Sequence, residues 1–258
     1  MWPLHIYDWP NDQIFASIGY LAPPVALTRI KLKEKARFVV AHGGWKYYEL
    51  PSVYHCAIPI KILNKIRERT GRVFHSTQPD VFTAMAIPAF TDLAINIGKT
   101  VTFNGRSSSS NGYGFVNRKA RVNIERFINE YKDYRFHPSI YKNFTATTKM
   151  IPDAVLLAKD FFPEEYKDVN FNYSAMLAYV CRLGFAGYAE ILRDWKKIKL
   201  QQPISYLSFF WYSFLHELGK NRRILLNKFT SIKILKNEVP KNISEFAISL
   251  ADPDRDNK

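Results

Sequence analysis

The residues best able to do chemistry gather between Tyr47 and Gly112. The polar and aromatic candidates in this stretch are Tyr54, His55, His75, Ser76, Gln78 and Asp80. A carboxylate can take a proton from a hydroxyl group when partial burial raises its pKa. Asp80 follows Gln78-Pro79 at the predicted start of a helix, where it could instead only cap the helix. Capping favours the anion and would lower the pKa, so that base catalysis by Asp80 requires burial to offset it.

Several other chemistries lack their sequence motifs. The chain has no Walker-type phosphate loop, no Cys-x-x-Cys, no His-Glu-x-x-His, no EF-hand spacing and no Gly-x-Ser-x-Gly elbow. The histidines are scattered, which is typical of structural histidines. Aspartates at alternate positions occur only between Asp252 and Asp256, in a segment predicted to be a frayed tail. The sequence therefore predicts no metal site.

A series of short motifs gives this chain a family resemblance. In chain order they are Tyr7-Asp-Trp-Pro10, Tyr54-His55, Arg69-Thr-Gly71, Pro79-Asp-Val81 and a loop from Asn104 to Gly112. Their order and spacing resemble the second half of the catalytic domain of bacterial family-2 glycosyltransferases, which have the GT-A fold. The similarity covers roughly residues 5 to 165.

The resemblance implies inverting transfer of a sugar, of the hexosyltransferase type, in the synthesis of a bacterial surface polysaccharide. The donor would be a nucleotide sugar, and the acceptor a saccharide or a lipid-linked glycan. Asp80 matches the position of the family's general base, and the other candidates named above would bind acceptor hydroxyls. The Gly- and Ser-rich loop with Arg106, Ser107 and Asn111 resembles a loop that closes over the site, and Arg106 could neutralise the diphosphate. The alternatives are that the aromatic side chains between Tyr47 and Tyr54 pack in a core and that the loop is an ordinary exposed one.

The chain also departs from the family pattern at its start. Family members begin with a nucleotide-binding half that carries an Asp-x-Asp-like motif for a divalent metal such as Mg or Mn. Met1 falls just after the place where that motif would be. We therefore expect no cofactor in this chain, no transferase activity without the missing half, and a possible partner chain that supplies it. We also expect an exposed sheet edge where the missing strands would pair.

The predicted fold class is α/β, an incomplete GT-A-like sheet with flanking helices, followed by an all-α C-terminal region. The expected parts are residues 1–135 as the catalytic half-domain, 136–250 as helical accessory region and 251–258 as a disordered tail. Expected strands are 37–42 and a hairpin or two short strands around Gly98-Lys99, and 47–54 is expected to be extended. Predicted helices are 59–70, one that opens at Gln78, 119–131, 153–162, 172–183, 186–199, 205–218 and 222–233. Gly71, Gly184 and Gly219 are the predicted helix stops.

The net charge suggests an alternative function. The chain carries 37 Lys and Arg against 23 Asp and Glu, a formal net charge of +14. Residues 190–237 are rich in basic and aromatic side chains, so a non-enzymatic basic module could bind an anionic membrane surface or another polyanion. Nucleic acid is the less favoured polyanion, because no known nucleic-acid motif is present. The two cysteines, Cys56 and Cys181, are expected to be reduced, which favours a cytoplasmic protein, peripheral on the inner membrane if it binds lipid.

Overall fold

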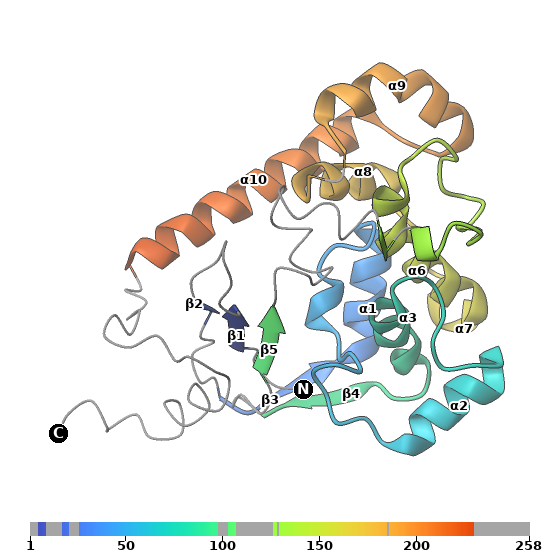
Figure 1. Ribbon diagram of the computed structural model, residues 1–258, viewed down its shortest axis with the longest axis vertical. Helices are drawn as coiled ribbons and strands as arrows, with labels where there is room; N and C mark the ends of the chain where they lie inside the picture. Colours follow the sequence, from blue (N-terminus) through green and yellow to red (C-terminus); the bar gives the residue numbers. More distant parts are fainter. Residues whose placement is uncertain are drawn as a thin grey trace. The chain divides into compact units, whose positions relative to one another are not determined.

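The computed structural model describes residues 5–8, 17–20, 26–97, 103–106, 126–127, 129–184 and 186–229 (Figure 1). The chain forms two compact units. The first combines Leu27–Asn96 with Tyr131–Leu225, and the second is built from Trp2–Ala26, Ile97–Glu130 and Leu226–Lys258. The predicted boundary at residue 135 does not separate the two units, because segments on both sides of it share one hydrophobic core.

The first unit begins with a two-stranded antiparallel sheet. Strand β3 (Thr28–Lys31) pairs with β4 (Leu93–Asn96), so that Ile30 lies opposite Ala94. The second unit contains a three-stranded sheet in which β1 (His5–Asp8) lies between β2 (Ser17–Tyr20) and β5 (Phe103–Arg106), antiparallel to β2 and parallel to β5. Two short strands do flank Gly98-Lys99, as one of the two predicted alternatives has it. They do not form a hairpin, since β4 and β5 belong to different sheets.

The predicted strand at 37–42 is wrong, because these residues lie in helix α1 (Leu32–Ala41). Its buried residues are Leu32, Ala36, Val39 and Val40. Their spacing of four, three and one is that of one helical face, and it becomes visible only when the window starts at Leu32. The predicted extended segment 47–54 is also wrong at its start, where a 3-10 turn, η1 (Tyr47–Glu49), follows α1.

Two helices match the sequence prediction closely. Helix α2 (Ile60–Thr70) ends at Gly71, whose φ of 82° is the left-handed conformation that favours glycine. Helix α3 (Pro79–Ala86) begins at Pro79 and continues into a 3-10 turn, η2 (Ile87–Ala89). All six residues from Val81 to Ala86 are buried, so α3 is a core helix rather than an amphipathic one.

Most of the described chain between residues 146 and 229 is helical, as predicted. Its helices are α6 (Ala146–Phe161), α7 (Pro163–Tyr166), α8 (Tyr173–Arg182), α9 (Tyr188–Gln201) and α10 (Tyr206–Phe229). Gly184 follows α8 with a φ of 74°, which confirms that stop. Gly219 is not a stop, because α10 runs through it and joins the two helices predicted at 205–218 and 222–233. Of the helix predicted at 119–131, residues 126–127 and 129–130 are helical, residue 131 lies in a turn, and the others are outside the described residues. The predicted tail 251–258 also lies outside the described residues.

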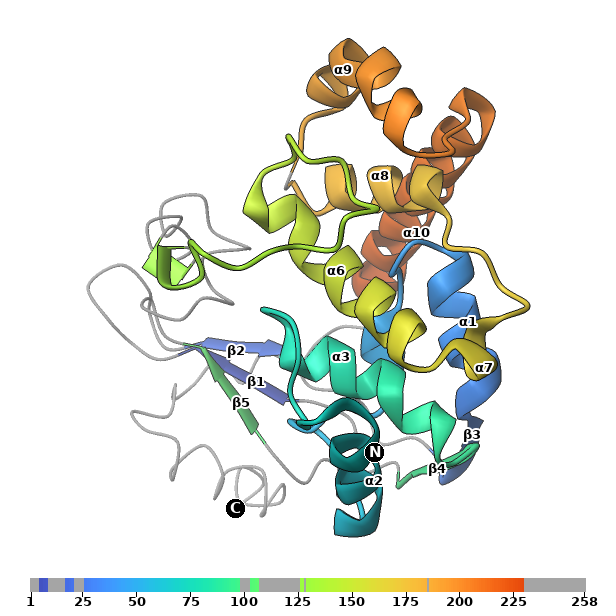
Figure 2. The ribbon, with the colours of Figure 1, turned by 90° about the vertical axis from the view of Figure 1, so that its right-hand side faces the viewer.

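The core of the first unit forms where α3 packs against α6, and Figure 2 shows the two helices side by side. Its largest fully buried side chains include Phe82 and Met85 of α3, Met176 of α8 and Ile191 of α9. No helix among the described residues is both long and apolar enough to cross a membrane.

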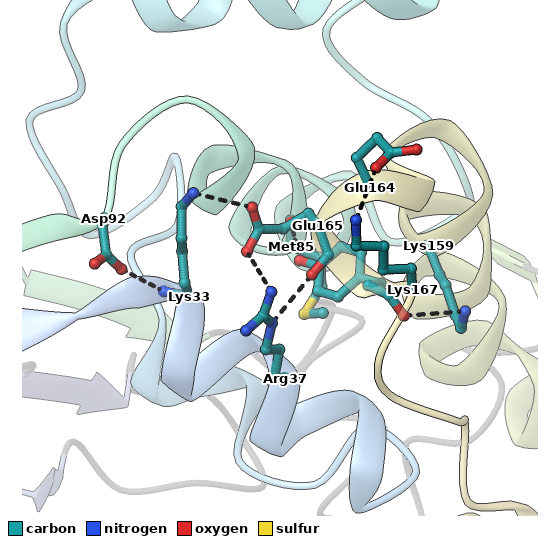
Figure 3. A network of polar contacts seen from close by, with 9 residues as sticks. Lys33, Arg37, Met85, Asp92, Lys159, Glu164, Glu165 and Lys167 are labelled. Atoms are coloured by element: carbon teal, nitrogen blue, oxygen red, sulfur yellow. Dashed lines mark hydrogen bonds and ion pairs between the residues drawn. The ribbon is translucent and has the colours of Figure 1, made fainter.

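A buried carboxylate ties α7 to α1 (Figure 3). Glu165 lies 3.2 Å from Lys33 Nζ and 4.0 Å from Arg37 Nη2, and its backbone carbonyl accepts a hydrogen bond from Arg37 Nε at 3.1 Å. Two cations beside this carboxylate compensate for its removal from water. The neighbouring Tyr166 donates its hydroxyl hydrogen bond to the Met85 carbonyl at the end of α3. These contacts hold helices α1, α3 and α7 together.

Candidate functional site

Asp80 lies in the first turn of α3, but it is not the N-cap residue. The cap position belongs to Gln78, and Pro79 takes the first helical position. The predicted N-cap role of Asp80 is therefore wrong, because the N-cap residue lies two positions earlier in the sequence. Its carboxylate still accepts hydrogen bonds from the backbone N–H groups of Val81 and of Asp80 itself, which are free at a helix start.

Burial raises the pKa of the Asp80 carboxyl above its ordinary value of 3.8. The two backbone N–H groups and the nearby ring of His55 act in the opposite direction, and burial outweighs them. Asp80 as a whole is nevertheless only half-buried. A half-buried carboxylate with a raised pKa is a competent proton acceptor.

The charge of this carboxylate acts on three further side chains. Burial raises the pKa of Tyr47 to about 12, and the charge of Asp80 adds to the effect. Burial and then Asp80 also raise the pKa of Tyr54, whose ring centroid lies 6.3 Å from that of His55. Burial lowers the pKa of His55, which keeps the ring neutral at pH 7, while Asp80 opposes this shift. The structure thus brings Tyr54 and His55 together with Asp80, across 25 residues of sequence.

His55 carries an unused polar atom. Its Nδ1 is buried and has no hydrogen-bond partner within the described part of the chain. Buried polar atoms are nearly always satisfied in folded proteins, so that an exception needs an explanation.

His75 uses its polar atoms within the fold. Its Nε2 lies 3.0 Å from Thr70 Oγ1 and 3.1 Å from the Arg72 carbonyl, and its Nδ1 accepts from Arg72 Nε at 3.3 Å. The buried ring packs between Phe82 and Phe161, with centroid distances of 4.6 and 4.7 Å. In this state His75 supports the turn that precedes α3.

Ser76 and Gln78 also make internal hydrogen bonds. Ser76 has a φ of 64°, a left-handed conformation that is uncommon for a residue with a side chain. Its Oγ donates to Asp153 Oδ2 at 2.6 Å, and Gln78 Nε2 donates to the Thr77 carbonyl at 3.0 Å. The contact with Asp153 holds the strained turn in place, and that turn leads directly into Asp80.

Asp153 is the residue that the sequence analysis missed. It is fully buried on α6 and accepts three hydrogen bonds, from Ser76 Oγ, from the Tyr134 hydroxyl at 2.7 Å and from the His137 backbone N–H at 2.7 Å. Burial raises its pKa, and the three donors act against that shift. The available signal was an acidic residue inside the apolar run Met150–Leu157.

The remaining predicted residues belong to the second unit. Arg106 ends strand β5, and its side chain is outside the description, as are Ser107 and Asn111 entirely. Their predicted roles stay predictions. Within the described ranges, no group of three or more His, Cys, Asp or Glu side chains could hold a metal ion.

A second group of titratable residues lies around His216 of α10. His216 is buried, and neither ring nitrogen has a hydrogen-bond partner among the described residues. Its ring packs edge-on against Trp45, with a centroid distance of 4.6 Å, and lies 5.8 Å from the ring of Tyr179. Burial lowers its pKa to about 4, assisted by the positive charge of Arg182 and by His42. A neutral His216 therefore helps to hold α10 on the first unit.

Comparison with models of protein families, with curated proteins and with solved structures gives no match. The function is therefore inferred from the residues and their surroundings.

We predict that Asp153→Ala lowers the free energy of unfolding by about 3 kcal/mol or more, because three donors lose their acceptor. The matched control is Asp168→Ala, which removes an exposed carboxylate of the same unit, so that its loss should change the free energy of unfolding by less than about 0.5 kcal/mol. Urea unfolding measures both. Equal losses would show that the buried network does not hold the turn.

We predict that the protein loses stability as the pH falls from 6.5 towards 4. In this window the unfolded chain protonates His216 and the folded protein does not, because its folded pKa is about 4. The expected contribution between pH 7 and pH 5 is about 2 kcal/mol. Urea unfolding of the His216→Leu variant should show a correspondingly smaller difference between these pH values. An unchanged difference would mean that His216 titrates normally.

Proposed function

We propose that this chain supplies the acceptor side of an inverting sugar transfer, with Asp80 as the general base. The donor is a nucleotide sugar, and the acceptor is a hydroxyl group of a saccharide or of a lipid-linked glycan. The observation that carries the proposal is the raised pKa of Asp80, in which burial outweighs two backbone N–H groups. Helix N–H groups alone would lower the pKa of this carboxyl, so that the raised pKa reflects its burial.

In the proposed step, a carboxylate oxygen of Asp80 takes the proton of the acceptor hydroxyl. The hydroxyl oxygen forms a bond to the anomeric carbon, and the bond from that carbon to the nucleotide diphosphate breaks. The diphosphate leaves with the electron pair, and the attack from the opposite face inverts the anomeric centre. The buried Nδ1 of His55 and the hydroxyl of Tyr54 would orient the acceptor by hydrogen bonds.

The proposal extends to the fold. The described residues show a mixed α/β region followed by helices, and the finer interpretation is an incomplete GT-A-like sheet. Supporting it, the two-stranded sheet of β3 and β4 leaves apolar side chains largely exposed at its ends, namely those of Leu27 and Leu93. Further strands added beside this sheet would cover such side chains.

For the donor side, the proposal names candidate residues only. A divalent metal would help the diphosphate to leave, but the described residues provide no ligands for it. The nucleotide and its metal would be held by another segment or by a partner chain. Arg106, Ser107 and Asn111 are kept as candidates for the donor side, and a cytoplasmic location is part of the same proposal.

The proposal is tested by sugar transfer from a panel of nucleotide sugars, measured with the chain alone and in a lysate of cells that express it, where a partner chain can be present. We expect Asp80→Asn to lower kcat/KM by a factor of about 100 to 10,000, the usual contribution of a general base. The matched control is Asp168→Asn, which removes an exposed carboxylate of the same unit and should leave turnover unchanged. In the unmodified protein kcat/KM should rise with pH through a pKa above that of an ordinary aspartate.

A stability measurement separates a catalytic loss from misfolding. Because burial raises the folded-state pKa of Asp80, its ionisation costs stability at every pH above the ordinary value. Asp80→Asn should therefore be at least as stable as the unmodified protein at pH 7. Full turnover of a stable Asp80→Asn variant would remove Asp80 from the reaction. A non-enzymatic polyanion-binding module would show no turnover in any arm.

A further inference from the structure

Helix α10 presents a continuous apolar face to the outside. Five large apolar side chains on it are between 48% and 85% exposed, namely Leu207, Phe210, Trp211, Phe214 and Leu218. They recur at intervals of three, one, three and four, so that they line one side of the helix over three turns. We call these five residues the apolar stripe.

The opposite side of α10 attaches the helix to the first unit. Phe209, Ser213 and His216 are buried there, and Phe209 packs against Trp195 of α9 with a centroid distance of 5.4 Å. The helix therefore has its own packed face, and the apolar stripe is a second, exposed one. An exposed apolar face of this length is rare on monomeric soluble proteins and marks an interaction surface.

The charge next to α10 indicates the chemistry of the partner. Helix α9, which packs against α10 through Trp195 and Phe209, carries four exposed basic residues, Arg193, Lys196, Lys197 and Lys199. Its two acidic residues are Glu190 and Asp194, so that α9 has a net charge of +2. Asp194 already pairs with Arg193 at 3.6 Å and with Lys197 at 3.9 Å.

We propose that the apolar stripe binds the surface of an anionic lipid bilayer. The helix would lie in the plane of the interface, with the stripe in contact with the acyl chains and the basic residues among the anionic headgroups. The stripe includes Trp211, and Tyr206 at the start of α10 is half-exposed. Both side chains are of the type enriched at membrane interfaces.

The charge also argues against a second copy of the chain as the partner. Two copies that met through α10 would bring together two surfaces of the same sign, on chains that each carry a net charge of +14. An anionic bilayer offers both an apolar layer and the opposite charge. The proposal does not depend on sugar transfer, and its test uses no nucleotide sugar.

The test is sedimentation of the full chain with vesicles of phosphatidylcholine, with or without about 30% phosphatidylglycerol. We expect binding to the anionic vesicles that weakens with added salt, and binding about tenfold weaker without the anionic lipid. The Trp211→Ser, Phe214→Ser double variant should bind about tenfold more weakly than the unmodified chain or worse. The matched control is Ile60→Ser, Phe74→Ser, which removes two side chains of similar exposure, 69% and 53%, from elsewhere in the same unit and should bind like the unmodified chain.

A second measurement compares the unmodified chain with a conservative variant that keeps an aromatic side chain in the stripe. Lipids brominated in their acyl chains should quench part of the tryptophan fluorescence of the unmodified chain, and Trp211→Phe should remove that part. Equal binding by the stripe variant and the control, or no quenching that depends on Trp211, would overturn the proposal. So would a dimer that the stripe variant disrupts together with an absence of vesicle binding, because the partner would then be a second copy.

Discussion

The hydrogen bonds to the buried carboxylate of Asp153 are the constraint on which the candidate site depends. They join α6 to the turn before α3, through a serine in a left-handed conformation that the local sequence does not favour. Because Ser76 is held there, α3 begins at Pro79, and Asp80 enters the first turn at the edge of the core. A contact between residues 77 positions apart thus sets the surroundings of the residue to which we assign the chemistry.

Asp80 is half-buried and Asp153 is fully buried, and we infer different roles for them from their hydrogen bonds. Burial raises the pKa of both Asp153 and Asp80. Three donors from different segments surround Asp153, so that it is committed to the fold. Among the described residues, the groups that hydrogen-bond to the Asp80 carboxylate are backbone N–H groups of its own helix turn, and Asp80 is half-buried. The unpartnered Nδ1 of His55 adds a second polar group with unused capacity near the same carboxylate.

Local patterns predicted local features well and distant ones poorly. Helix α2 and its stop at Gly71 follow from spacing within eleven residues. Helix α1 was missed because Arg37–His42, read alone, has strand composition. Gly219 failed as a stop because packing of α10 overrides the weak helix propensity of one glycine. The role of Asp153 could not be predicted, since nothing near it in sequence identifies Ser76 or Tyr134 as its donors.

The most direct test of the account is the pKa of Asp80 in the folded chain. Carboxyl carbon shifts of aspartate-labelled protein, followed by NMR through an acid titration, give this value, and the Asp80→Asn variant assigns the signal. The account predicts a pKa above the ordinary 3.8, because burial outweighs the helix N–H groups. A pKa at or below 3.8 would show that Asp80 is a helix-capping anion, and the assignment of a general base would be lost.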